Sequence, residues 1–127
     1  MHSCRSARSS RPARSVSPIA SIASCSAPSI VSRSEAGWND RIALAERLGA
    51  RVLTDLKLGA AFPTTHPLHA GPAGMFLTPE TAQVLQAADV VLSLDWLDLG
   101  GTLKQAWGND PVGSRVIQAS VDHHIHN

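Results

Sequence analysis

Cysteine is nearly absent from this chain, and so are the motifs on which many small enzymes depend. Cys4 and Cys25 both lie close to the N-terminus, and no cysteine follows them. Two thiols without regular spacing predict neither a disulfide framework nor a zinc site. The chain also lacks a G-x-S-x-G nucleophile motif and a Walker phosphate loop. We therefore predict no catalytic residue from motifs of these kinds.

Long apolar runs are missing as well. No run approaches the ~18–20 residues that a membrane-spanning helix needs, so we expect no association with a membrane. A hydrophobic content of 43% in 127 residues is nevertheless enough for a folded core. Length and composition together predict one small domain.

Acidic residues are absent from positions 1–34, a segment rich in serine, arginine, alanine and proline. It shows no lasting helical or strand period, so we predict a disordered tail. From Glu35 onward six basic residues face ten acidic ones, a net charge of −4. The difference in charge and composition places a domain boundary between the tail and residues 35–127.

Three interpretations of the tail remain open. Such a mixture is what GC-rich DNA yields when it is translated in the wrong frame, and this is the interpretation we favour. A targeting or disordered leader would have a similar composition. Binding of nucleic acid is disfavoured, because no aromatic residues or lysine clusters accompany the arginines. We expect a cytoplasmic location, or an organellar one if the tail is a transit peptide.

Helical and strand patterns alternate from Glu35 to the end of the chain. Apolar residues recur at helical spacing up to Gly49, which stands where a left-handed cap would end a helix. Thr78 and Pro79 are typical of a helix start, and the apolar run VVLSL is typical of a strand buried on both faces. The patterns predict helices over 35–48, 79–89 and 99–108, and strands over 51–56, 90–94 and 114–122.

This alternation predicts an α/β fold with a three-layer, Rossmann-like parallel sheet, as in nucleotide-binding domains. A strand is expected before the first helix, but the tail stands in its place, and no helix pattern follows the last strand. Three strands leave the edges of such a sheet poorly covered. We therefore predict an incomplete sheet.

The first strand leads into a long loop over 54–76, a length that is unusual inside a compact fold unless the loop has a function. Gly71 and Gly74 could let backbone approach a ligand, but they do not form a dinucleotide fingerprint. His66 and His69 lack a third ligand nearby. We interpret them as polar loop residues near a domain or subunit contact, and we predict no metal site.

The second strand ends in the stretch DWLDLGG, and two interpretations of it are open. Ligands of open α/β sheets bind at the carboxyl ends of strands, where Asp95 could hold hydroxyl groups and Gly100 and Gly101 could present free N–H groups. Alternatively, Asp98 caps the following helix, Trp96 belongs to the core, and the glycines are turn residues. We favour this second, structural interpretation.

The third strand ends near Asp122, where nucleotide-binding folds often carry an acid. His123, His124 and His126 follow it closely. Adjacent histidines without a nearby carboxylate partner are usually solvated, so we do not assign a metal to them.

Three segments, LAERLGARVLTDLKLGAAFPTTHPLHAG, LQAADVVLSLDWLDLGGTL and IQASVDHHIHN, resemble the central domain of thiamine-diphosphate-dependent enzymes such as acetolactate synthase and benzoylformate decarboxylase. The resemblance covers residues 35–127 and identifies them as part of that domain. It implies a larger homo-oligomeric enzyme that cleaves or joins carbon–carbon bonds at 2-oxo acids. The remaining domains would be its partners and would bind thiamine diphosphate and magnesium.

The resemblance also implies which residues could contact a cofactor here. Some members hold FAD or an adenine nucleotide at the strand ends of this domain, and by position the candidates are Asp95, Gly100, Gly101 and Asp122. FAD-binding members carry an arginine soon after the second strand, and this chain does not, which disfavours FAD. Alternatives to an enzyme fragment are a stand-alone nucleotide-binding or partner-binding module and a non-functional gene remnant.

Overall fold

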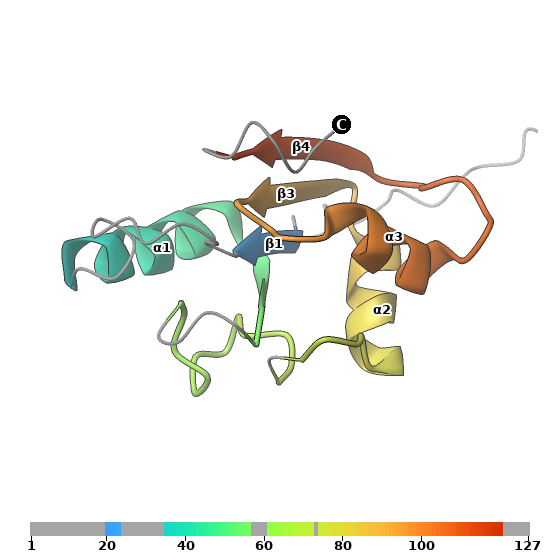
Figure 1. Cartoon of the computed structure of the whole chain (residues 1–127). Helices are drawn as coiled ribbons and strands as arrows, with labels where there is room; N and C mark the ends of the chain where they lie inside the picture. The colour runs from blue at the N-terminus through green and yellow to red at the C-terminus, as the bar shows by residue number, and fades with distance from the viewer. Residues whose placement is uncertain (1–19, 24–34, 57–60, 73, 121–127) are drawn as a thin grey trace, which may run out of the picture.

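The computed structural model describes residues 20–23, 35–56, 61–72 and 74–120. Within them, four parallel strands form one sheet with the order β2-β1-β3-β4 (Figure 1). The strands are β1 (Ala20–Ala23), β2 (Arg51–Thr54), β3 (Val90–Leu94) and β4 (Arg115–Ala119). The helices are α1 (Glu35–Leu48), α2 (Pro79–Ala87) and α3 (Leu99–Trp107).

Strand β1 corrects the prediction that residues 1–34 form a disordered tail, because Ala20–Ala23 lie inside the sheet. Ala20 is opposite Arg51 of β2 on one side and Val91 of β3 on the other. The four residues contain a single β-branched side chain, so local propensity did not reveal the strand. A central position supplies ladder partners on both sides, and that context outweighs propensity. The other residues of 1–34 lie outside the described residues.

The two faces of the sheet carry separate cores. Val52 packs with Ala45 of α1 and with Phe62, whereas its neighbour Leu53 belongs to a cluster with Leu85 of α2. Successive side chains of a strand point to opposite faces. Helix α1 therefore covers one face, and α2 and α3 cover the other, as Figure 1 shows. This confirms the three-layer α/β fold predicted from the sequence.

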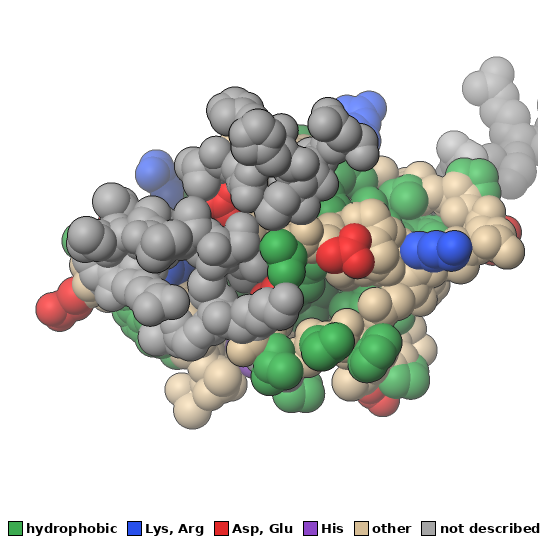
Figure 2. Space-filling model, in the orientation of Figure 1, with side chains coloured by type: hydrophobic (Ala, Val, Ile, Leu, Met, Phe, Trp, Pro, Cys, Tyr) green, Lys and Arg blue, Asp and Glu red, His purple; other side chains and the backbone are tan. Residues whose placement is uncertain are grey.

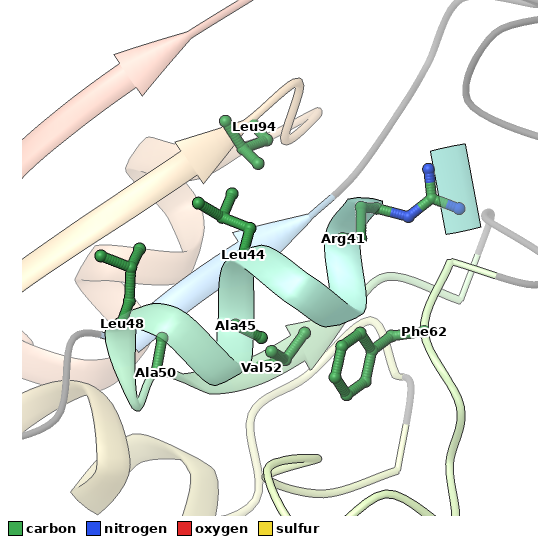
Figure 3. A pocket seen from close by; sticks show the side chains of 8 residues that line it. All are labelled: Arg41, Leu44, Ala45, Leu48, Ala50, Val52, Phe62 and Leu94. Atoms are coloured by element: carbon green, nitrogen blue, oxygen red, sulfur yellow. The ribbon is translucent and has the colours of Figure 1, made fainter. Parts of the chain in front are cut away.

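Strand β3 is less evenly buried than its apolar sequence predicted. Val91 and Ser93 are fully buried beneath α2 and α3, whereas Leu94 on the opposite face is only partly covered. Leu94 lines a small apolar pocket with Leu44 and Leu48 of α1, and Figure 3 shows Leu44 pointing toward Leu94. Among the described elements, one helix covers that face and two cover the other. The prediction that β3 is buried on both faces is therefore wrong for the side chains on the α1 side.

Strand β4 lies at the edge of the sheet, and all five of its residues are exposed. Ile117 is 54% exposed although it is strongly apolar. This confirms the predicted poorly covered edge. The described helices are also too short or too polar for any of them to span a lipid bilayer.

The ends of the first two helices follow the sequence signals. Gly49 has a φ of 60°, the left-handed conformation that ends α1. The Thr78 hydroxyl accepts a hydrogen bond from the Thr81 amide at 3.3 Å and so caps the start of α2. Pro79 occupies the first turn, where its missing N–H has no cost.

The core generates a first prediction. Leu85 is 0% exposed, so Leu85→Ala should lower the free energy of unfolding of the 127-residue chain by about 2–5 kcal/mol, because the cavity left behind cannot be refilled. Leu56 is 61% exposed, so the matched variant Leu56→Ala should change the free energy of unfolding by less than about 0.5 kcal/mol. Urea denaturation measures both. Equal losses would contradict the position of the core.

Candidate functional site

The strand order points to one place where a ligand or partner would bind. From β1 the chain passes through α1 to β2 on one side, whereas β3 and β4 lie on the other side of β1. The connections therefore diverge between β1 and β3. In open α/β sheets, binding sites lie outside the carboxyl ends of the strands at such a switch point.

A cavity of about 300 Å³ lies at this edge of the sheet. Asp55 directly follows β2, and Trp96 and Asp98 follow β3, so side chains from two strand ends meet in its wall. The loop before α2 and the first turns of α3 complete the wall. Among the residues that the structure describes, the lining consists of Asp55, Gly74, Met75, Trp96, Leu97, Asp98, Thr102 and Gln105.

Trp96 is fixed by a chain of two hydrogen bonds. Its Nε1–H donates to the hydroxyl of Thr102 at 2.8 Å, and this hydroxyl donates to the backbone carbonyl of Asp98 at 2.8 Å. The ring is almost completely buried and belongs to the core formed with α2 and α3. Because both polar groups are satisfied internally, this pair forms a rigid wall rather than a reactive centre.

Asp98 caps helix α3. Its Oδ1 accepts a hydrogen bond from the Gly101 amide at 2.8 Å. A carboxylate at this position satisfies one of the free N–H groups and interacts favourably with the positive end of the helix. A phosphate group approaching the same helix end would meet that negative charge, so the start of α3 is poorly suited to a diphosphate.

The two glycines of the turn have different roles. A Cβ placed on Gly101 would come within 2.1 Å of Asp98 Oδ2, whereas one on Gly100 would have its nearest neighbour 4.0 Å away. Only the second glycine is therefore required by the cap. The capping carboxylate lies directly over its Cα, which leaves no room for a side chain.

Asp95 is the one non-glycine residue in the described part of the chain with a positive φ, at 53°. Aspartate tolerates this left-handed conformation better than most residues. Its amide donates to the carbonyl of Ala119 at 2.8 Å, which extends the pairing of β3 with β4 by one bond. Asp95 thus ends β3 and turns the chain toward α3.

The structure brings together three of the four residues predicted to contact a cofactor. Asp95 follows β3, whereas Gly100 and Gly101 lie in the first turn of α3 and not in the preceding turn; none of the three is among the described residues of the cavity wall. The roles as helix cap and core residue considered for Asp98 and Trp96 are confirmed. Contact of the three with a ligand stays a prediction. Asp122 lies outside the described residues, as do His123, His124 and His126.

Sequence reasoning missed three polar residues of the cavity wall, Asp55, Thr102 and Gln105. The predicted strand over 51–56 and the predicted loop over 54–76 overlap at Asp55. Strand β2 ends at Thr54, two residues before the predicted end, and leaves Asp55 at the carboxyl edge. Gln105 gave no signal, because only the packing of α3 against the loop brings it to the cavity.

The loop histidines hold the loop on the protein surface. His66 Nε2 lies 3.3 Å from a carboxylate oxygen of Glu46 on α1, and His69 Nε2 lies 3.3 Å from the Thr54 hydroxyl. Both rings contact Phe62, with centroid distances of 5.1 and 6.5 Å. Nowhere in the described ranges do three or more His, Cys, Asp or Glu side chains group as metal ligands would.

His69 is half-buried, and its environment disfavours the charged form. Burial, and to a lesser extent the positive charge of Arg51, lower the pKa of His69 below its ordinary value of 6.5. Arg51 Nε is itself buried without a hydrogen-bond partner. This end of the loop therefore packs best when His69 is neutral.

Comparison with known proteins identifies relatives of the chain. Residues 30–125 match the family described as thiamine pyrophosphate enzyme, central domain. Sulfoacetaldehyde acetyltransferase of Rhodobacter capsulatus is 49% identical over 86 residues, which is 65% of this chain and 14% of the relative. The enzyme of the same name from Castellaniella defragrans is 39% identical over 102 residues, 75% of this chain and 17% of the relative. That from Alcaligenes xylosoxydans xylosoxydans is 42% identical over 83 residues.

The chain thus spans only 14–17% of the length of these relatives. No solved structure matches it significantly.

The glycine pair generates a second prediction. Gly100→Ala should stabilise the chain slightly, because alanine favours the helix and the space is open, whereas Gly101→Ala should displace the Asp98 cap. We expect Gly101→Ala to be less stable than Gly100→Ala by about 1–2 kcal/mol in urea denaturation. In an Asp98→Ala background the cap is already lost, and the difference should disappear. A difference that persists would show that the cap is not its cause.

The environment of His69 generates a third prediction. Because the pKa of His69 is lower in the folded chain than in the unfolded chain, the unfolded chain binds the proton first as the pH falls. The contribution of His69 to stability is therefore complete above pH 6.5 and is lost as the pH falls from 6.5 through the folded-state pKa. His69→Gln should reduce the fall in melting temperature between about pH 7.5 and pH 5.5. An unchanged pH dependence in this variant would refute the assignment.

Proposed function

Because this chain belongs to the family of thiamine pyrophosphate enzyme central domains, we propose that it serves as the central-domain segment of an acetyl-transferring enzyme that depends on thiamine diphosphate. The match over residues 30–125 is the observation that carries the proposal. The names of the relatives support acetyl transfer with sulfoacetaldehyde as the substrate. The resemblance to acetolactate synthase implies a 2-oxo acid as the substrate, whereas the names of the relatives favour sulfoacetaldehyde.

Thiamine diphosphate and magnesium do not fit the residues described here. Within the described segments no three His, Cys, Asp or Glu side chains are grouped as ligands for a cation. The start of α3, the natural position for a diphosphate at a strand end, already carries the carboxylate of Asp98. We therefore assign both groups to the remaining domains of the enzyme. The same capped helix end disfavours FAD or an adenine nucleotide at Gly100 and Gly101.

The role proposed for this chain is accordingly structural. Its described residues form a rigid wall at the carboxyl edge of the sheet, with Trp96 and Thr102 locked by hydrogen bonds. Such a wall can position neighbouring domains around a cofactor without touching it. A homo-oligomeric enzyme located in the cytoplasm is part of the same proposal.

An exchange of segments tests this function, and it is the fourth prediction. Residues 35–119 of this chain replace the matching segment of the Castellaniella defragrans enzyme, and the consumption of sulfoacetaldehyde is measured with and without thiamine diphosphate. We expect the chimera to retain cofactor-dependent activity, because the exchanged segment supplies packing rather than catalytic groups. The unmodified relative is the positive control, and the isolated 127-residue chain should show no turnover. A folded chimera without activity would refute the proposal, and so would turnover by the isolated chain.

A further inference from the structure

Three large apolar side chains are exposed at the carboxyl edge of the sheet. Leu56 is 61% exposed, Met75 66% and Phe76 76%, and we call these three residues the docking rim. Figure 2 shows apolar side chains gathered on the lower part of the visible face, where Figure 1 places the loop before α2. Exposed apolar groups that lie together mark surfaces that another protein surface covers.

The docking rim lies beside the cavity. Met75 is part of the cavity wall, and Leu56 directly follows Asp55 of the same wall. Phe76 and Met75 also line a neighbouring smaller pocket, which shares Trp96 and Gln105 with the cavity. Met75, Phe76 and the hollow thus form one continuous surface, in which side chains of a partner could be inserted.

The backbone of this part of the loop is held firmly. Gln105 of α3 accepts a hydrogen bond from the Leu77 amide at 2.8 Å and donates one to the Met75 carbonyl at 3.5 Å. Gly71 packs so closely on α2 that a Cβ would come within 2.6 Å of Thr81 Cγ2. The side chains of Met75 and Phe76 are therefore presented to solvent by an anchored segment, and a partner need not order the loop on binding.

The charge of the cavity restricts its partner. Asp55 and Asp98 contribute two carboxylates to the wall, and no lysine or arginine is among the described residues that line it. A basic side chain with an aliphatic stem would match this combination, since the stem could lie against Met75 while the charged end faces the carboxylates.

The length of the relatives indicates where such a partner comes from. This chain corresponds to 14–17% of them, so most of the enzyme must pack around it. We propose that the docking rim and the adjacent cavity bind a segment of another domain of the same enzyme, in which apolar side chains contact Phe76 and a basic side chain enters the cavity. This inference rests on the proposed function.

Hydrogen exchange in the active chimera tests the inference, and it is the fifth prediction. Amides of residues 74–78 should exchange at least about tenfold more slowly in the chimera than in the 127-residue chain, because the contact protects them. Phe76→Ser should remove this protection in the chimera. Phe76 is so exposed that the melting temperature of the 127-residue chain should not change, which shows that the variant folds.

Matched variants separate the contact from general effects. Val112 is an apolar residue that is 38% exposed and precedes β4, at the other edge of the sheet, so Val112→Ser should leave the protection intact. Asp98→Asn keeps a capping side chain but removes the charge, and it should weaken the protection.

The outcomes distinguish the two proposals. An active chimera without protection at residues 74–78, or with protection that survives Phe76→Ser, would overturn the docking surface alone. Protection that is unaffected by Asp98→Asn would overturn the basic partner. A folded chimera without activity would refute the proposed function, and the inference with it.

Discussion

The pairing of β1 with both β2 and β3 is the constraint on which the arrangement of this chain depends. Ala20–Ala23 align with Arg51–Thr54 on one side and with Val91–Leu94 on the other, so the three strands end at one common edge. A strand inside a sheet satisfies its backbone groups through partners on both sides. If β1 were absent, strands β2 and β3 would not share a sheet, and Asp55 and Trp96 would not meet in the wall of one cavity.

The turn after β3 shows how far stability alone can explain a sequence that suggests function. An acid, a large ring, a second acid and two glycines are what a ligand site at a strand end would contain. Here Asp95 ends the strand in a left-handed conformation, Trp96 enters the core, and Asp98 caps the next helix over Gly101. Each of these residues except Gly100 is accounted for by folding. The cap also places a negative charge where a phosphate would otherwise be favoured.

The described surface is unevenly covered, and this fits a segment of a larger enzyme. Val116 and Ile117, on the two faces of β4, and the docking rim expose apolar side chains, while each side of the sheet carries a core of buried residues. A small domain can bury only part of its apolar surface. In a protein several times longer, such as the relatives, the remaining apolar groups become contacts between domains.

The sequence by itself determined the helices, three of the strands and the α/β class. These depend on local signals such as the apolar period before Gly49 and the cap residues Thr78 and Asp98. It also carried the family resemblance. Only the tertiary structure decided that Ala20–Ala23 form the central strand, because its stability comes from ladder partners about 30 and 70 residues away. The cavity wall was likewise beyond the sequence, since Gln105 reaches the loop only through the packing of α3, a contact that no local pattern encodes.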